Sequence, residues 1–263
     1  MLKYTSIASS SSGNCHYIGY KEKGILVDAG LSGKKIKEGL DKFDIKIENI
    51  VAILISHEHT DHIKGAGILS RRYDIPIYAN QKTFDAMKEK IGCIHEKNIK
   101  IFQTDKKFEI DDIQITPFSI HHDAKDPVAF TFDTGNTKIS IATDLGYVCE
   151  NIKKNVCSSK LVVLESNHDV EMVKMGPYPY SLKKRVLSKK GHLSNEDAGK
   201  FALDLVKTGT EKILLAHLSK ENNFPDLAFE TVNSILKMNN IQVGKDVNLK
   251  VLDKDISSNL YAV

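Results

Sequence analysis

Apolar and polar residues alternate in blocks that predict a chain of mixed strands and helices. Short, mostly apolar runs predict strands over residues 24–30, 50–55, 75–79, 161–165, 213–216 and 248–252. Apolar positions at helical spacing predict helices over residues 32–43, 81–91, 194–207 and 225–239, with a further helix beginning near residue 63. Residues 3–8 and 15–20 are typical of two strands that are joined by a serine-rich loop over residues 9–14.

The order of these elements indicates the architecture. Strands and helices come first, a β-rich stretch follows over residues 99–142, and helices and strands then alternate to the end. We find no linker, low-complexity tract or strong repeat in the sequence. One α/β domain over residues 1–263, with two packed sheets and outer helices, fits this order better than two domains.

Composition is that of an ordinary globular chain, with 41% hydrophobic and 27% charged residues. The net charge of +3 neither requires nor excludes a nucleic-acid partner. Four cysteines without a CxxC pair are typical of free thiols in a reducing compartment. The first residues lack the apolar core of a signal peptide, and no apolar run approaches membrane-spanning length. We therefore expect a cytoplasmic protein without a membrane partner.

Four side chains of the metal-ligand type lie within six residues, directly after the strand predicted over 50–55. They are His57, His59, Asp61 and His62, and imidazole nitrogen and carboxylate oxygen are ligands for zinc and similar divalent ions. His57 and His59 are two residues apart, so in an extended segment both side chains leave the same face. Asp61 and His62 follow one tight turn later and can point to a second position. The spacing therefore predicts a loop that supplies ligands to two metal ions.

Further His and Asp residues follow predicted strands elsewhere in the chain. His121 and His122 end one strand, Asp144 ends another and His217 ends a third. Each residue alone is more typical of a capping or solvated group, but together with the loop just described they can fill two coordination shells. Asp144 is our choice for a carboxylate that bridges the two ions. Asp28 also ends a strand, and we expect it to orient a ligating histidine, as carboxylates near metal sites commonly do.

The stretch from His57 to His62 matches the HxHxDH signature of the metallo-β-lactamase superfamily. Within that superfamily the chain resembles the YycJ (WalJ)-type group of small single-domain hydrolases. The motifs that carry this resemblance lie at residues 11–14, 122–128, 167–169, 191–195 and 217–223. Two residues depart from the pattern of the group, because Ser10 stands where we expect Gly and Ser166 where we expect Ala. Neither departure falls on a ligand position.

The resemblance implies an αββα sandwich, with two mixed β-sheets, outer helices and two divalent metal ions at one edge of the sheets. Zinc or manganese is the expected metal. The implied ligands are His57, His59 and His122 for the first ion, and Asp61, His62 and His217 for the second, with Asp144 bridging. His121 is the rival of His122 for the first ion, but the position directly before the Asp-Ala pair favours His122.

Two such ions about 3.5–4 Å apart generate hydroxide near neutral pH and clamp an in-line displacement. We expect Asp61 to lie beside that bridging hydroxide. The same site suits phosphodiester, lactone or thioester hydrolysis, so other features must indicate the substrate. Residues 172–195 contain six positive charges and no acidic residue. We interpret this basic run as a wall that binds phosphates rather than as a solvated face, with Lys183, Lys184, Arg185, Lys189 and Lys190 as the candidates.

Other polar residues near the basic run are further candidates for substrate contacts. Ser194 and Asn195 open a predicted helix with capping-box spacing, and a helix N-terminus is a ready anion site. We expect His192 beside them to act as a proton source for the leaving oxygen. Tyr178 and Tyr180 are candidates for stacking on a base. The remaining predicted substrate contacts are Ser12, Asn14, Asn167 and His168.

These features favour nucleic acid, or another nucleotide phosphodiester, as the substrate. The resemblance implies a DNA exonuclease that acts in the 5′ to 3′ direction and has a part in mismatch repair. The alternative is a small-molecule metallo-hydrolase: a cyclic or nucleotide phosphodiesterase, a lactonase or a thioesterase. A di-iron redox protein is disfavoured because such relatives replace the second His of the signature with Glu, whereas His59 is intact. An inactive binding module is disfavoured because no ligand is missing.

Overall fold

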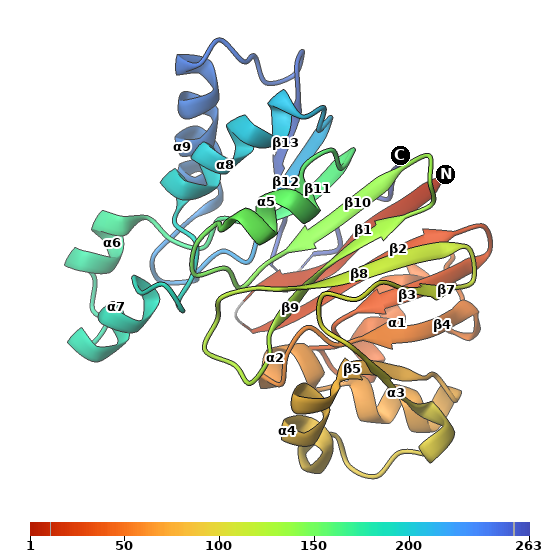
Figure 1. Ribbon diagram of the computed structural model, residues 1–263. Coiled ribbons are helices and arrows are strands. Elements are labelled where there is room, and N and C mark those ends of the chain that lie inside the picture. The colour runs from red at the N-terminus through yellow and green to blue at the C-terminus, as the bar shows by residue number, and fades with distance from the viewer. Residues whose placement is uncertain (11, 255) are drawn as a thin grey trace.

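Three clusters of buried apolar side chains define the layers of the molecule. One lies between two β-sheets, and the other two lie between each sheet and its own outer helices. The computed structural model describes residues 1–10, 12–254 and 256–263, and Figure 1 shows helices on both outer sides of the paired sheets. The predicted αββα sandwich with two mixed sheets is thereby confirmed. The assignment of residues 1–263 to a single domain stays a prediction.

The first sheet combines antiparallel and parallel strands. In order across the sheet, its strands are β14 (Tyr261–Ala262), β1 (Leu2–Ser10), β2 (Gly13–Tyr20), β3 (Lys23–Val27), β4 (Ile50–Leu54), β5 (Ile77–Asn80) and β6 (Ile99–Phe102). Pairing is antiparallel from β14 to β3 and parallel from β3 to β6.

The second sheet is also mixed. In order across the sheet, its strands are β13 (Asn248–Val251), β12 (Lys212–Ala216), β11 (Leu161–Glu165), β10 (Lys138–Ala142), β9 (Val128–Asp133), β8 (Ile113–Ser119) and β7 (Phe108–Ile110). Pairing is parallel from β13 to β10 and antiparallel from β10 to β7. The β-rich middle of the sequence is thus divided, because β6 belongs to the first sheet and β7 to β10 form the antiparallel part of the second.

Strand β11 shows why unbroken apolar runs form the central strands. Successive side chains of a strand point to opposite faces. Val162 and Leu164 pack against the outer helices, whereas Leu161 and Val163 pack between the two sheets. Because both faces are covered, every position of β11 before the last one, Glu165, is apolar, as is usual for buried parallel strands.

Six helices cover the outer faces. On the first sheet they are α1 (Gly33–Asp41), α3 (Ala66–Tyr73) and α4 (Gln81–Ile91). On the second sheet they are α5 (Glu150–Val156), α8 (Asn195–Lys207) and α9 (Pro225–Met238). Two 3₁₀ turns, η1 (Ile47–Asn49) and η2 (Glu96–Asn98), precede β4 and β6. The predicted helices are present with ends within three residues of the predicted ones, and Ser194 caps α8 by accepting a hydrogen bond from the backbone N–H of Asp197.

The first hairpin differs from the prediction. Strand β1 continues to Ser10 and β2 begins at Gly13, so most of the predicted loop over residues 9–14 is strand. Ser9 pairs with Asn14 and Ser10 with Gly13 across the ladder. Burial and strand pairing outweigh the turn preference of serine here, because strand preference depends strongly on context. Ser11 lies outside the described residues.

Two short helices in the basic run are absent from the prediction. They are α6 (Val170–Met175) and α7 (Tyr180–Val186), and Figure 1 shows them together at one side of the sandwich. Each spans fewer than eight residues, so the apolar spacing of a longer helix does not develop. Among the described residues, no helix is long and apolar enough to cross a membrane.

Candidate metal centre and active cleft

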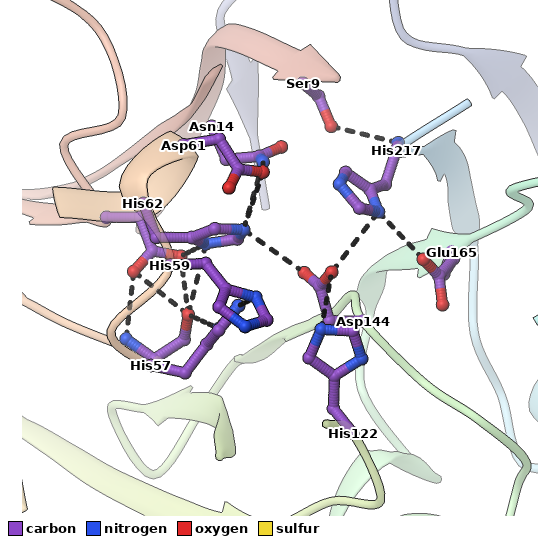
Figure 2. Close-up of polar contacts among 12 residues, drawn as sticks. Ser9, Asn14, His57, His59, Asp61, His62, His122, Asp144, Glu165 and His217 are labelled. Carbon is purple, nitrogen blue, oxygen red and sulfur yellow. Dashed lines mark hydrogen bonds and ion pairs between the residues drawn. The ribbon is translucent and has the colours of Figure 1, made fainter. Parts of the chain in front are cut away.

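The predicted ligands meet at one edge of the two sheets, where strands end. Strand β4 leads to His57 and His59, and the four-residue helix α2 (Thr60–Ile63) then carries Asp61 and His62. Strands β8, β10 and β12 lead in turn to His122, Asp144 and His217. Figure 2 shows these side chains converging from different elements on one small volume. Residues that are up to 160 positions apart in the sequence are thus brought into one site.

Three of the strand-end residues adopt a left-handed backbone conformation. Their φ angles are 60° at Asp28, 59° at Asp144 and 57° at His217. This region is uncommon for residues other than glycine and costs on the order of 1 kcal/mol or more for each residue. Each residue lies within two positions of the end of its strand and turns the chain sharply there. Such strained positions cluster at functional sites, and here all three carry side chains of the metal centre or its supports.

The helix α2 is held tightly against the end of β3. The backbone N–H of Ala29 donates to the carbonyl of His62 over 2.7 Å, and that of Gly30 donates to the carbonyl of Asn14 over 2.8 Å. A Cβ atom at Gly30 would lie only 1.6 Å from the carbonyl oxygen of Asp61. Glycine is therefore required at this position for the backbone to approach the helix that carries Asp61 and His62.

The first candidate ion site consists of His57, His59 and His122, whose ligand atoms all lie within 4.8 Å of one another. Nε2 of His57 lies 2.9 Å from Nδ1 of His59. The rings of His57 and His59 are 5.1 and 5.2 Å from that of His122. This is the histidine set that was predicted for the first ion, and three imidazoles in this arrangement suit a divalent transition metal.

The second candidate ion site consists of Asp61, His62 and His217, which satisfy the same 4.8 Å criterion. Oδ2 of Asp61 lies 3.4 Å from Nε2 of His62. Asn14, a predicted substrate contact, places its side-chain nitrogen 3.2 Å from the same Nε2 atom. The structure thus brings together the three residues that were predicted for the second ion, with Asn14 beside them.

Asp144 lies between the two sets. One carboxylate oxygen is 3.5 Å from Nε2 of His62, and the other is 3.7 Å from Nε2 of His122. Figure 2 shows the carboxylate at the centre of the group. Its two oxygens thus face the two candidate ion sites, which is the arrangement that a bridging carboxylate needs.

Asp28 supports His62 from behind. Its buried carboxylate accepts hydrogen bonds from Nδ1 of His62 over 2.8 Å and from the backbone N–H of Ser56 over 2.9 Å. The hydroxyl of Ser56 in turn lies 3.0 Å from Nδ1 of His57. Because Nδ1 of each histidine is occupied, Nε2 is left to face the metal site. These are the contacts expected of a carboxylate that orients a ligand.

Glu165 holds the opposite side of the site and is absent from the predicted set. It is fully buried, and its Oε1 atom accepts hydrogen bonds from Nδ1 of His217 over 2.8 Å and from Nδ1 of His192 over 2.9 Å. Its other oxygen accepts from the backbone N–H groups of Leu145 and Leu193. The signal that identifies Asp28, an acid that ends a buried strand, is also present at Glu165, the last residue of β11.

Two buried atoms show that the site fits metal ions. Nε2 of His217 and Oδ2 of Asp144 have no hydrogen-bond partner among the described residues. A buried polar group without a partner costs free energy, so such atoms call for a ligand. Both atoms belong to the predicted ligand set, and imidazole and carboxylate are the donors that zinc and manganese accept.

Asp144 and His57 have the protonation states that ligation requires, whereas His62 and His217 do not, because their pKa values are raised. Burial would raise the pKa of the Asp144 carboxyl group, but the three neighbouring imidazoles outweigh burial and lower that pKa. Burial lowers the pKa of His57 well below its ordinary value, so its imidazole is neutral. Burial likewise acts to lower the pKa of His217, but Asp144 and Glu165 outweigh it and raise that pKa to about 9. Because a ligating imidazole is neutral, metal binding at His217 displaces a proton.

A cleft of about 270 Å³ opens over the two candidate ion sites. We call it the active cleft, and it is lined by His59, Asp61, His122, Asp144, Asn167, Tyr178, Leu182, Arg185, Val186, His192, His217 and Ser219. Helix α7 thus contributes one wall of the cleft, which the helical pattern of the sequence did not indicate.

Four of the predicted substrate or catalytic residues outside the ligand set line the active cleft: Asn167, Tyr178, Arg185 and His192. Asn167 donates to the carbonyl of His217 over 2.7 Å, so its amide also supports a ligand. His192 is partly exposed in the cleft, with Nδ1 held by Glu165. Arg185 lines the cleft and forms an ion pair with Asp123.

Other predicted substrate residues lie outside the lining of the cleft. Ser12 is exposed at the end of the first hairpin, and His168 is buried. The hydroxyl of Ser194 caps α8. Asn195 is buried and accepts a hydrogen bond from Ser166 over 2.6 Å, so this departure from the family pattern has a structural role. These contacts indicate that Ser194 and Asn195 position the chain rather than the substrate.

The basic run divides into paired and unpaired cations. Lys183 donates to the carbonyl of Lys174 over 2.6 Å and so links α7 to α6. Lys184, Lys189 and Lys190 are exposed and have no carboxylate partner within the described part of the chain. Lys184 and Lys190 are therefore free positive charges of this face, whereas the ammonium group of Lys189 lies over the Tyr147 ring, 5.7 Å from its centroid.

His121 points away from the candidate ion sites. It is exposed, and its Nε2 atom lies 3.1 Å from the hydroxyl of Tyr147. His122 is buried, and its Nδ1 atom lies 3.2 Å from the carbonyl of Gly191. The structure therefore places His122, and not its rival, within the first ligand set.

Comparison with known proteins agrees with this fold. A family model described as Beta-lactamase superfamily domain matches residues 23–218. The chain belongs to the metallo-β-lactamase superfamily. Within it, the chain is of the YycJ type, since it is 40% identical over 262 residues to Exodeoxyribonuclease YycJ of Bacillus anthracis, covering 100% of this chain and 99% of that relative. It is 42% identical over 254 residues to Exodeoxyribonuclease WalJ of Streptococcus pneumoniae, covering 96% of this chain and 94% of that relative.

Solved structures of the metallo-β-lactamase superfamily share the layers of this chain. The metallo-β-lactamase fold protein YhfI from Bacillus subtilis superposes with a TM-score of 0.73 at 17% identity, and the match covers 98% of each chain. At this identity the likeness shows the fold alone. The two mixed seven-stranded sheets with flanking helices thus match the fold of this solved structure.

Proposed function

We propose that this protein is a metal-dependent exodeoxyribonuclease. The observation that carries the proposal is its 40% identity to Exodeoxyribonuclease YycJ over the full length of both chains. A second relative, Exodeoxyribonuclease WalJ, matches at 42% over nearly the same length. The convergence of the predicted ligands on one cleft supports a hydrolytic site within that framework.

The proposed cofactor is a pair of divalent ions, zinc or manganese. His57, His59 and His122 would hold one ion, and Asp61, His62 and His217 the other, with Asp144 shared. When bound, such ions lower the pKa of a water molecule and neutralise charge on phosphoryl oxygens. These seven residues would offer each ion four protein ligands, since Asp144 would serve both.

His192 is our candidate for the proton donor to the leaving oxygen. It is partly exposed in the active cleft, and Glu165 accepts the hydrogen bond from its Nδ1 atom. Nε2 is then free to face the substrate. The neighbouring carboxylate orients the ring, and a general acid must be oriented toward the atom that it protonates.

The basic face beside the cleft is our candidate for the grip on the DNA backbone. Lys184, Lys189 and Lys190 are exposed on this face, and Arg185 lines the cleft. Contacts between cationic side chains and phosphates do not depend on the nucleotide sequence of the DNA. Such a face suits an exonuclease, which must accept every sequence in turn.

We extend the proposal to 5′ to 3′ polarity and a part in mismatch repair, both on the family resemblance. We also propose a cytoplasmic location. The four cysteines are free in the part of the chain that the structure describes, which fits a reducing compartment.

Labelled DNA tests the proposed activity. The protein is stripped of metal with a chelator, reloaded with zinc or manganese, and incubated with duplex DNA that carries a label at either the 5′ or the 3′ end. We expect early release of labelled mononucleotide from the 5′ end and a progressive ladder from the 3′-labelled strand. Hydrolysis of a cyclic nucleotide, lactone or thioester without any cleavage of DNA would instead establish the alternative function of a small-molecule hydrolase.

A further inference from the structure

The active cleft has two chemically different sides. Metal-ligand residues line one part of it, and Tyr178, Leu182 and Val186 line another part, which we call the Tyr178 wall. A phosphodiester needs the polar side alone, so the apolar wall calls for a different part of the substrate. In a nucleic acid the part that is attached to the phosphate and has broad apolar faces is the nucleobase.

The wall has a regular construction. Leu182 and Val186 are four residues apart in α7 and so lie on the same side of the helix. Tyr178 precedes the helix by two residues and extends the same side toward the cleft. Tyr180 lies between Tyr178 and Leu182 in the sequence, but it is 82% exposed and is not part of the cleft lining. The two tyrosines of this segment therefore have different positions, and only Tyr178 faces the site.

The wall is attached to the catalytic residues. The backbone N–H of His192 donates to the carbonyl of Val186 over 3.1 Å. Arg185 forms its ion pair with Asp123, the neighbour of the ligand His122. A surface that is attached at both of these points can hold a base in a constant position relative to the scissile bond, as efficient catalysis requires.

We propose that the Tyr178 wall is a binding site for the base of the terminal nucleotide, with the tyrosine ring stacked on the base. The inference rests on the proposed exonuclease function. The cleft, of about 270 Å³, has room for one nucleoside. It is too small to enclose a duplex, of which the major groove alone is ~12 Å wide. The terminal nucleotide therefore enters unpaired. Because stacking uses the faces of the base and not its edges, the site accepts all four bases.

Two product analogues that differ only in the base provide the test. Binding of thymidine 5′-monophosphate and of deoxyribose 5-phosphate to the metal-loaded protein is measured by calorimetry. We expect the nucleotide to bind about tenfold more tightly, which is the range of one stacked base. Tyr178→Ala should weaken binding of the nucleotide alone and so abolish the difference between the two affinities. Tyr178→Phe should retain that difference.

Tyr180→Ala is the matched control, because it removes the same ring from the same segment outside the cleft. Equal affinities for the two analogues in the unmodified protein, binding of neither, or an equal loss in the two alanine variants would overturn the inference. Release of nucleotides from labelled DNA is measured in parallel. If DNA is not cleaved with either metal, the exonuclease proposal fails, while the ratio of the two affinities still decides whether the wall binds a base.

Discussion

Glu165 and His217 lie in direct contact across the buried end of the second sheet, with 2.8 Å between Oε1 and Nδ1. The carboxylate comes from the end of β11 and the imidazole from the position after β12, so the parallel pairing of these strands sets their separation. The same oxygen also accepts from His192. One buried acid thus orients a metal ligand and the candidate proton donor together.

Replacing Glu165 should therefore weaken metal binding. In Glu165→Gln the amide cannot serve as a charged acceptor for both imidazoles, and we expect affinity for the second ion to fall roughly 10- to 100-fold. Competition with a chromophoric chelator measures this affinity. Glu211→Gln, which alters an exposed ion pair with Lys160, is the control and should leave it unchanged. Equal affinities in the two variants would exclude an orienting role for Glu165.

Asp61→Ala should abolish hydrolysis and leave the fold intact. Asp61 lies at the edge of the core beside His62, and it is a proposed ligand as well as a cleft residue. We expect turnover to fall roughly 10³-fold or more, as it does when a catalytic group is removed, while the circular dichroism spectrum stays unchanged. A variant that keeps near-normal turnover would remove Asp61 from the mechanism. Asp41→Ala, at an exposed position of α1, is the comparison.

Neutralising two free lysines of the basic face should weaken DNA binding and reduce its salt dependence. For Lys184→Ala combined with Lys190→Ala, we expect the slope of log affinity against log salt to become shallower by about 2 if both contact phosphates. Hydrolysis of a minimal phosphodiester should not change.

The matched control for this pair is Lys207→Ala combined with Lys245→Ala, since both lysines are exposed and lie outside the basic run. Fluorescence anisotropy with labelled DNA gives the slopes. If the two double variants show the same slope as the unmodified protein, the basic run is an ordinary solvated face.

His192→Ala should slow turnover on DNA and on a minimal phosphodiester alike. A general acid typically contributes ~10²- to 10⁴-fold, and His192 is placed in the cleft by its bond to Glu165. Substrates with leaving groups of low pKa need less proton donation, so their rates should fall less. His95→Ala removes the exposed histidine that precedes and caps η2, and it should have no effect on turnover. A loss of turnover on DNA alone, with unchanged turnover on the minimal phosphodiester, would instead assign His192 to substrate binding.

Because His168 is buried, we expect the free energy of unfolding of the protein to fall in mild acid. Burial lowers the pKa of His168 from 6.5 to about 4, so between these pH values the unfolded chain binds a proton that the folded chain does not. Stability is therefore lost as the pH falls through this window, by about 3 kcal/mol in all. Urea unfolding from pH 7 to pH 4 should show a shallower decline for His168→Gln than for the unmodified protein or His95→Gln. Parallel declines would show that His168 does not contribute.

Local sequence patterns were sufficient to predict most of the helices and strands of the fold. Strands β4, β11 and β12 are buried on both faces, so their unbroken apolar runs identify them without any knowledge of their partners. The HxHxDH stretch likewise carries its ligands within six residues, and their spacing alone indicated two ion positions. Patterns that are complete within one segment can be recognised from that segment.

Only the tertiary structure decided what depends on contacts between segments. Glu165 has the same strand-end signal as Asp28, but its role comes from the pairing of β11 with β12, which places it beside His217. Tyr178 and Tyr180 are equivalent in the sequence, and only the packing of α7 over the cleft separates them. Burial and direction of a side chain are set by neighbours that are distant in sequence, and a local pattern carries no information about those neighbours.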